Sequence, residues 1–156
     1  MVIPDKQKRI AAATAIATAI AIPAEGLRQY AYYDPPGILT VCYGSTTNVE
    51  KNKKYSFEEC KARLEKDMLN AIKQVEQCHS GLPTEVLAAF GDAVYNVGPT
   101  VACNSTASRF LSISDYKGAC NQLPRWNKAK IMGIYIELPG LTKRRNKEKE
   151  ICLLGT

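Results

Sequence analysis

At 156 residues the chain is long enough for one folded unit with its own core, because roughly two thirds of the unfolded surface is buried at this size. Hydrophobic residues make up 46% and charged residues 23%, which excludes a disordered or fibrous protein and is typical of a soluble globular domain. The net charge of +6 is unevenly placed, since residues 125–149 hold eight Lys or Arg against two Glu. We therefore expect a basic C-terminal face that is either simply solvated or attracts nucleic acid, anionic lipid or an acidic cell-wall polymer.

The first element is an alanine-rich segment, residues 10–24, that follows Lys6, Lys8 and Arg9. A positive flank before an apolar run is typical of an export signal. Eight of its fifteen residues are Ala and four are Ile. Such a weakly apolar helix spans about 22 Å, against about 30 Å for a bilayer core. The segment is suited to enter a membrane and leave it again; a helix packed on the domain and a cleaved signal peptide are the alternatives, and cleavage is disfavoured because Glu25 follows at once.

A short antiparallel hairpin or meander is predicted next, within residues 30–41. Its sequence, YAYYDPPGILTV, places aromatic and branched residues on both sides of a Pro-Pro-Gly turn. We expect Glu25 to lie at the end of a helix, with Asp34 and Thr40 on this small sheet.

A long amphipathic helix follows, because Ser56 and Glu59 form a capping box ahead of apolar positions that recur from Phe57 to Cys78 with a period close to 3.6. We expect it to link a small lobe to a helical one. Thr84 is predicted to cap a second helix, which ends before Gly98.

The C-terminal third is predicted to be helical. Shorter helices are expected around residues 105–111 and 115–123. A last helix is expected to be opened by Thr142 and closed by Gly155. The fold class is therefore α+β, mostly helical, with one small antiparallel sheet near the N-terminus.

Six cysteines are spread along the chain without a CxxC pair, and His79 is the single histidine. This pattern argues against a zinc site and against other metals or cofactors. An even number of widely spaced cysteines in a small basic protein indicates up to three disulfides and an oxidising compartment such as a bacterial periplasm. Buried free thiols in a cytosolic protein are the alternative.

Two carboxylates and a polar helper are sufficient for glycoside hydrolysis. Glu25 lies beside the apolar segment, where desolvation favours the protonated form that a general acid needs. Asp34, beside the proline turn, is expected to stay ionised, and the Thr40 hydroxyl to reach a water molecule held by Asp34. The same residues are also ordinary as a helix-end charge, a turn former and a β-branched strand residue.

Residues 25–44, EGLRQYAYYDPPGILTVCYG, resemble the catalytic signature of the phage-type lysozymes, glycoside hydrolase family 24. In that signature Glu is followed by Asp nine positions later and by Thr six positions after that. Four later motifs resemble the family's helical lobe in the same order: YNVG at 95–98, NST at 104–106, DYKGACNQLPRW at 115–126 and LPGLTKRRNKEKEICL at 138–153. The resemblance runs from Glu25 to the C-terminus and implies a two-lobed, lysozyme-like fold.

The resemblance implies a muramidase that cleaves the β-1,4 bond between N-acetylmuramic acid and N-acetylglucosamine with inversion. Glu25 is then the general acid, and Asp34 and Thr40 align the attacking water across a carboxyl separation of about 6.5 to 9.5 Å. Arg144 matches the family position that ion-pairs with the catalytic Glu. Tyr43, Gly44, Asn96 and Arg144 are the expected substrate-binding residues. Where relatives often have Gly-His-Thr, this chain has Gly-Ser-Thr at 44–46, a departure on one rim of the cleft.

The apolar segment resembles the signal-arrest-release tether of exported endolysins, which implies a tether at residues 1–24 and a catalytic domain at 25–156. The expected partners are peptidoglycan and, before release, the inner membrane of the host, with no nucleic acid; the protein is expected to act as a monomer in the host periplasm. Membrane insertion would hold Glu25 away from Asp34 and Thr40, so release would activate lysis. Because the tether lacks Cys, we expect structural disulfides, with Cys78–Cys103 first.

Two other function classes fit the same sequence. One is a non-catalytic protein that binds peptidoglycan through its basic face. The other is a basic membrane-disrupting protein that acts through its C-terminal helix.

Overall fold

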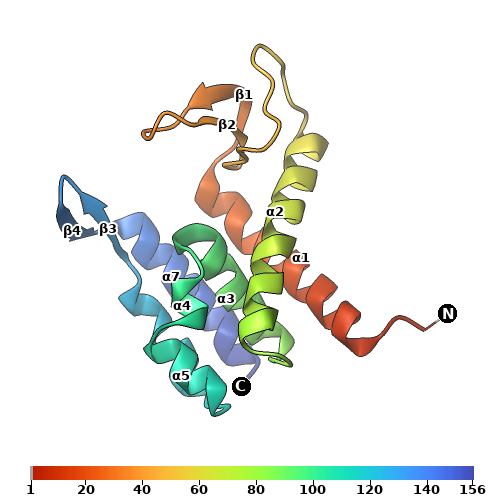
Figure 1. The fold of residues 1–156 in the computed structure, drawn as a ribbon, viewed down its shortest axis with the longest axis vertical. Helices are drawn as coiled ribbons and strands as arrows, with labels where there is room; N and C mark the ends of the chain where they lie inside the picture. Colours follow the sequence, from red (N-terminus) through yellow and green to blue (C-terminus); the bar gives the residue numbers. More distant parts are fainter. Residues whose placement is uncertain (1) are drawn as a thin grey trace.

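A small lobe and a larger helical lobe are joined by one long helix (Figure 1). The structure, a computed structural model, describes residues 2–156. The small lobe contains β1 (Arg28–Tyr33) and β2 (Leu39–Cys42), and α2 (Phe57–Cys78) runs from it into the helical lobe. The mostly helical α+β architecture that the sequence predicts is confirmed.

The alanine-rich segment forms a helix, α1 (Asp5–Glu25), which packs against α2, α3 (Thr84–Val97) and α7 (Pro139–Leu154). Its buried stripe repeats every four residues, so that one narrow face of small side chains meets the core. The members of this stripe are fully buried: Ala13, Ala17 and Ala21. Of the alternatives that the sequence left open for this segment, a helix packed on the domain is the one observed, and the helix continues through residue 24 to Glu25 without a break.

Strands β1 and β2 pair in antiparallel fashion, with Tyr32 opposite Thr40 and an irregularity between Arg28 and Tyr32. The predicted hairpin is thus confirmed. Thr40 lies within β2, whereas Asp34 lies just after β1, in the turn. The disulfide Cys42–Cys60 fastens the end of β2 to the first turns of α2.

The capping box that begins α2 is present, since the Glu59 amide donates to the Ser56 hydroxyl and the Ser56 amide donates to the Glu59 carboxylate. The predicted apolar period is also observed. The buried positions of α2 include Cys60, Leu64, Met68, Ala71, Ile72 and Val75.

Two predicted helix starts are wrong. Pro83 precedes α3 and no side chain caps it, because Thr84 is already its first helical residue. The last helix, α7, begins at Pro139 rather than at Thr142, since proline fits the first turn of a helix, where its missing N–H is not needed. Between these two helices lie α4 (Thr100–Cys103), α5 (Thr106–Ser112), α6 (Tyr116–Cys120) and a 3-10 turn at Leu123–Arg125.

A second hairpin, which was not predicted, consists of β3 (Lys128–Ile131) and β4 (Ile134–Glu137). Its two-residue turn places Met132 at φ 49° and Gly133 at φ 82°. Two successive positive φ angles are typical of a type I′ turn, for which Asn-Gly is the usual signal. Because methionine occupies the first turn position in place of asparagine, the sequence does not predict this turn. In Figure 1 this hairpin projects from the helical lobe.

All six cysteines form disulfides. The expected pair Cys78–Cys103 is confirmed and joins α2 to α4. The third disulfide, Cys120–Cys152, joins α6 to α7. Within residues 2–156, no cluster of His, Cys, Asp and Glu is arranged to hold a metal ion.

The basic C-terminal face is smaller than its sequence suggests. Arg144 is 5% exposed and Arg145 is 0% exposed, and each is paired with a carboxylate. Exposed cations in this region are Arg125, Lys128, Lys130, Lys143 and Lys147. For the part of the chain that the structure covers, no helix combines the length and the hydropathy that crossing a bilayer requires.

Candidate active site

Glu25 is the last residue of α1, and Gly26 ends the helix with φ 74°. Its side chain is 22% exposed, and Oε1 accepts a hydrogen bond from Nη1 of Arg144 at 2.5 Å. The ion pair that the family resemblance implies is therefore present. It joins two helices whose sequences lie at opposite ends of the chain.

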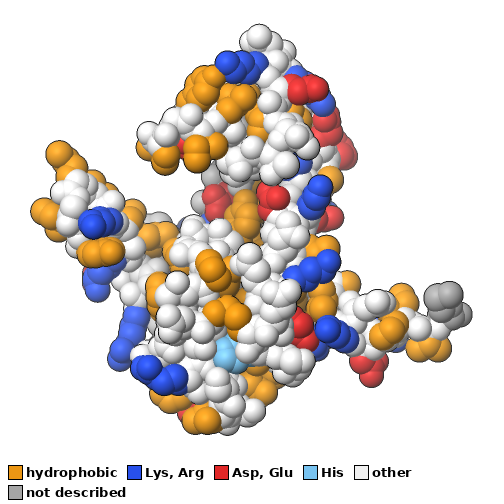
Figure 2. All heavy atoms as spheres, viewed as in Figure 1, with side chains coloured by type: hydrophobic (Ala, Val, Ile, Leu, Met, Phe, Trp, Pro, Cys, Tyr) orange, Lys and Arg blue, Asp and Glu red, His pale blue; other side chains and the backbone are white. Residues whose placement is uncertain are grey.

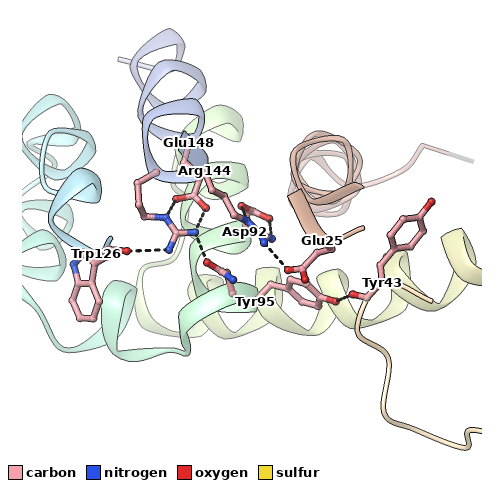
Figure 3. Close-up of polar contacts among 9 residues, drawn as sticks. Glu25, Tyr43, Asp92, Tyr95, Trp126, Arg144 and Glu148 are labelled. Atoms are coloured by element: carbon pink, nitrogen blue, oxygen red, sulfur yellow. Dashed lines mark hydrogen bonds and ion pairs between the residues drawn. The ribbon is translucent and has the colours of Figure 1, made fainter. Parts of the chain in front are cut away.

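Arg144 is held from behind by Asp92 of α3 (Figure 3). Nε donates to Oδ2 at 2.9 Å and Nη2 donates to Oδ1 at 2.8 Å, so the pairing is bidentate and leaves Nη1 for Glu25. Burial lowers the pKa of Arg144, but hydrogen bonding with Asp92 and the charges of Asp92 and Glu25 raise it above its ordinary value. Arg144 is thus a fixed cation beside Glu25.

A second pair, Arg145 with Glu148, lies deeper in the same cluster. Arg145 Nε lies 2.6 Å from Glu148 Oε1, and both side chains are fully buried. Arg145 Nη2 also donates to Oδ1 of Asn96 at 2.9 Å. Burial, followed by the proximity of Asp92, raises the pKa of Glu148 well above its ordinary value, although Arg145 opposes this rise. The cluster therefore has one carboxyl with a strong tendency to hold a proton.

The backbone after β2 approaches Glu25 closely. Tyr95 donates a hydrogen bond to the carbonyl oxygen of Tyr43 at 2.8 Å. A Cβ atom built on Gly44 would lie 3.7 Å from the Tyr95 hydroxyl and 3.9 Å from Oε2 of Glu25, and Gly44 has φ +96°. Glycine is required here for its backbone conformation. Burial and the charge of Glu25 raise the pKa of Tyr95, so this hydroxyl stays a donor.

Asp34 and Thr40 are organised by the same turn residue, Ile38. The Ile38 amide donates to Oδ1 of Asp34 at 2.7 Å. The Thr40 hydroxyl donates to the Ile38 carbonyl at 2.9 Å, and Thr40 is 3% exposed. Its hydroxyl proton is therefore used within the hairpin.

The rim at 44–46, where the family pattern is broken, is tied to α2 by Arg63. Nη1 of Arg63 donates to the Ser45 hydroxyl at 3.0 Å, and Arg63 also donates to the carbonyls of Thr47 and Asn48 at 2.6 and 2.8 Å. Hydrogen bonds from Arg63 therefore hold the Gly-Ser-Thr segment and the residues after it against α2.

The contacts divide the predicted site residues into groups. Glu25 contacts Arg144 and lies near the backbone at Gly44, which follows Tyr43. Asn96 instead binds Arg145 and supports the buried cluster. Asp34 and Thr40 share the hairpin turn, and across residues 2–156 neither is joined to Glu25 by a hydrogen bond or ion pair. Figure 2 shows a hollow between the two lobes with acidic side chains at its base.

Sequence reasoning missed three members of this cluster: Asp92, Arg145 and Glu148 did not enter the predicted site. A signal existed for Asp92, which is 0% exposed within the otherwise apolar buried stripe of α3. A buried carboxylate requires a charged partner, and this requirement points to a nearby Arg.

The model of the family described as "Phage lysozyme" matches residues 23–148. A relative, the SAR-endolysin of Bacteriophage PS119, is 38% identical over 133 residues, which cover 84% of this chain and 77% of the relative. The muramidase domain of SpmX from Asticaccaulis excentricus has a similar structure, with a TM-score of 0.80, 25% identity, and coverage of 88% of this chain and 94% of that one.

The endolysin Lyz of P1 phage has been solved in two forms that compare differently with this fold. The active form has a TM-score of 0.78 at 22% identity and covers 99% of this chain and 97% of its own. The secreted inactive form has a TM-score of 0.52 at 23% identity and covers 70% of this chain and 76% of its own. The fold described above therefore resembles the active form more closely.

Proposed function

Because the chain belongs to the phage lysozyme family and is a hydrolase of the lysozyme type, we propose that it is a muramidase for host cell lysis that cleaves the β-1,4 bond between N-acetylmuramic acid and N-acetylglucosamine in peptidoglycan. The observation that carries the proposal is the ion pair of Glu25 with Arg144, held in turn by Asp92. It places a carboxyl group and a fixed cation at the end of α1, where the two lobes meet.

Glu25 is proposed as the general acid. It donates its proton to the glycosidic oxygen as the C1–O bond breaks, and it becomes a carboxylate in the same step. Arg144 stabilises the charge that this step creates, because its own position is set beforehand by two hydrogen bonds to Asp92.

Asp34 and Thr40 are proposed to hold the attacking water. Asp34 accepts the proton that water loses as it adds to C1, and the Thr40 oxygen accepts a second hydrogen bond that orients the water. Their shared anchoring through Ile38 supports this role, because it holds both groups at one end of the hairpin. Inversion at C1 follows if a water molecule fits between Asp34 and the sugar, with Glu25 and Asp34 about 6.5 to 9.5 Å apart. Proton NMR of the first product anomer tests this step.

Tyr43 and Gly44 are proposed to contact the substrate at the cleft, whereas Arg144, which is 5% exposed and bonded to Asp92 and Glu25, is proposed to act through Glu25. The close approach of the Gly44 backbone to Glu25 supports this assignment. Asn96 is proposed to act indirectly, because its side-chain oxygen is used by Arg145.

We also propose that residues 1–24 act as a signal-arrest-release tether for the catalytic domain at 25–156. The name of the PS119 relative, a SAR-endolysin, supports this idea. Glu25 is the last residue of α1, so membrane insertion of α1 would take the acid out of the site. The protein would then start at the inner membrane and act in the host periplasm as a monomer.

Turbidity of outer-membrane-permeabilised Gram-negative cells tests the muramidase proposal. Wild type is expected to clear the suspension, Glu25→Gln to leave it turbid, and Glu150→Gln, at an exposed position of α7, to clear it normally. A peptidoglycan binder would leave all three suspensions turbid. A membrane disruptor would clear them all, and its activity would depend instead on exposed cations such as Lys143.

Four exposed alanines of α1 give a matched test of release: Ala11, Ala12, Ala15 and Ala19. Leucine at all four raises the apolarity of α1 without touching its buried stripe, so the variant is expected to stay in the membrane fraction and not to lyse cells. Serine at the same positions is expected to lyse normally. Lysis by the leucine variant at the wild-type time would disprove the tether.

A further inference from the structure

The β3–β4 hairpin has two chemically different faces. Directly opposed residues of an antiparallel pair lie on the same face of the sheet. Lys128 pairs with Glu137 and Lys130 with Tyr135, which makes a basic face. The other pairs are Ala129 with Ile136 and Ile131 with Ile134, which make an aliphatic face. The hairpin is therefore amphipathic.

The aliphatic face is largely exposed in the part of the chain that the structure describes. Ile134 is 65% exposed, Ile131 and Ile136 are each 42% exposed, and Met132 at the tip is 97% exposed. Figure 1 shows the hairpin projecting from the helical lobe, and Figure 2 shows apolar and basic side chains together on this projection. Exposed apolar side chains that are grouped on one face and bordered by charged residues are typical of interaction sites.

The surroundings of the hairpin are positively charged. Arg125, Lys128 and Lys130 are exposed on or just before β3. Lys143 and Lys147 line a surface cavity at the base of β4, where Glu137 and Glu150 are the acids. The surface around the hairpin therefore has five exposed cations and two acids, which leaves it positively charged. A partner that complements it is both apolar and anionic.

We propose that the β3–β4 hairpin docks the folded protein on an anionic lipid bilayer. Met132 and the aliphatic face enter the interface, while Lys128 and Lys130 contact lipid phosphates. Four residues of strand span about 13 Å, which is enough for the burial of about 5 to 10 Å that interfacial elements reach. The proposal goes beyond muramidase activity, and it concerns the folded protein rather than insertion of α1.

A glycan strand is a poorer partner for this surface. Sugars are bound by aromatic ring faces and by hydrogen-bonding side chains, and the aliphatic face has neither. The one aromatic residue, Tyr135, lies on the basic face, with Lys130 Nζ 5.8 Å from its ring centroid. A second copy of the chain offers an apolar face but also carries a net charge of +6, which opposes pairing.

Tryptophan at the tip reports insertion directly. Met132→Trp in the full chain is mixed with vesicles of phosphatidylglycerol and phosphatidylethanolamine, or with phosphatidylcholine alone. With the anionic vesicles we expect a blue shift of the emission and quenching by brominated acyl chains, beyond any change in the parent, which contains Trp126. Lys128→Gln with Lys130→Gln in this variant is expected to lower partitioning about 30-fold.

Lys61→Gln with Lys117→Gln, in exposed parts of α2 and α6, is the matched control, because it removes the same charge from outside the hairpin. The proposal is overturned if the tip tryptophan stays unquenched while the protein binds vesicles, if both lysine pairs weaken binding equally, or if light scattering shows a lipid-free dimer that Ile134→Ser dissociates. Vesicle binding is repeated with Glu25→Gln, which keeps the hairpin intact, so loss of hydrolysis and loss of docking are distinguished.

Discussion

The position of Arg144 depends on Asp92, a residue that does not reach Glu25 itself. Asp92→Asn keeps the shape of the side chain but removes the negative charge from a buried pair. Removing one charge of a buried pair destabilises a fold by up to about 3 to 5 kcal/mol, and here Glu25 remains as a second partner of Arg144. We expect this loss in the free energy of unfolding and a fall in kcat of about 10²-fold, because a displaced Arg144 no longer stabilises the departing charge.

Asp115→Asn is the matched control for this prediction. Asp115 caps α6 from an exposed position, where asparagine is an equally good cap, so both stability and kcat should stay near wild type. If the Asp92→Asn protein kept the wild-type kcat, Asp92 would have only a structural role.

Glu148 is expected to make stability depend on pH in an unusual direction. Its folded-state pKa is raised by burial and by Asp92, so between the unfolded value of about 4.3 and the folded value the folded protein holds the extra proton. Stability from this group therefore falls as pH rises through that window. Thermal melts against pH should show a shallower fall for Glu148→Gln than for wild type; parallel curves would contradict the assignment.

At this scale the sequence predicts residues that belong to a local pattern and misses those defined by tertiary neighbours. The spacing of Glu25, Asp34 and Thr40 is local. The partner of Arg144, in contrast, comes from α3 and is separated from it by 52 residues. Only the folded chain reveals that Asp92 faces it.

At the scale of elements, the N-terminal half of α1 is fastened by Arg9. Its guanidinium donates to both oxygens of Glu76 on α2, at 2.9 and 2.6 Å, and to the carbonyl of Leu82 at 3.2 Å. The hydrogen bonds from Arg9 lower the pKa of Glu76, although burial opposes them. The ion pair therefore contributes stability above pH about 4.3, and this contribution is lost as pH falls through the folded value.

Glu76→Gln is accordingly expected to reduce the free energy of unfolding at pH 7 by about 1 to 3 kcal/mol. Hydrogen exchange should show faster opening of the first turns of α1, with little change near Glu25. Below the folded pKa of Glu76 the two proteins should converge in stability. A difference that persisted unchanged into acid would show that the charge of Glu76 is not what fastens α1.

The sequence predicts elements whose apolar residues recur with a clear period. It does not predict elements whose position is set by a single turn or helix-start residue. The capping box and the apolar period predicted a helix from Phe57 to Cys78, and α2 has these bounds. The β3–β4 hairpin was missed because Met132 occupies a turn position at which Asn or Gly would have been recognised. The start of α7 was misplaced because Pro139 begins a helix instead of preceding one.

At the scale of the whole molecule, α1 has two roles. Its buried alanine stripe is part of the core, and its last residue is the proposed acid. The first role was one of three alternatives that the sequence left open. Only the folded chain reveals this role, because a weakly apolar, Ala-rich segment is compatible both with a membrane and with a packed core.

The release of reducing ends from purified peptidoglycan tests the central claim, that Glu25 at the end of the docked α1 breaks the glycosidic bond. Wild type should release fragments that end in reducing N-acetylmuramic acid, and Glu25→Gln, if equally stable in thermal melts, should be slower by about 10²- to 10⁴-fold. Hydrolysis by Glu25→Gln at the wild-type rate, or fragments that end in a different sugar, would contradict the account.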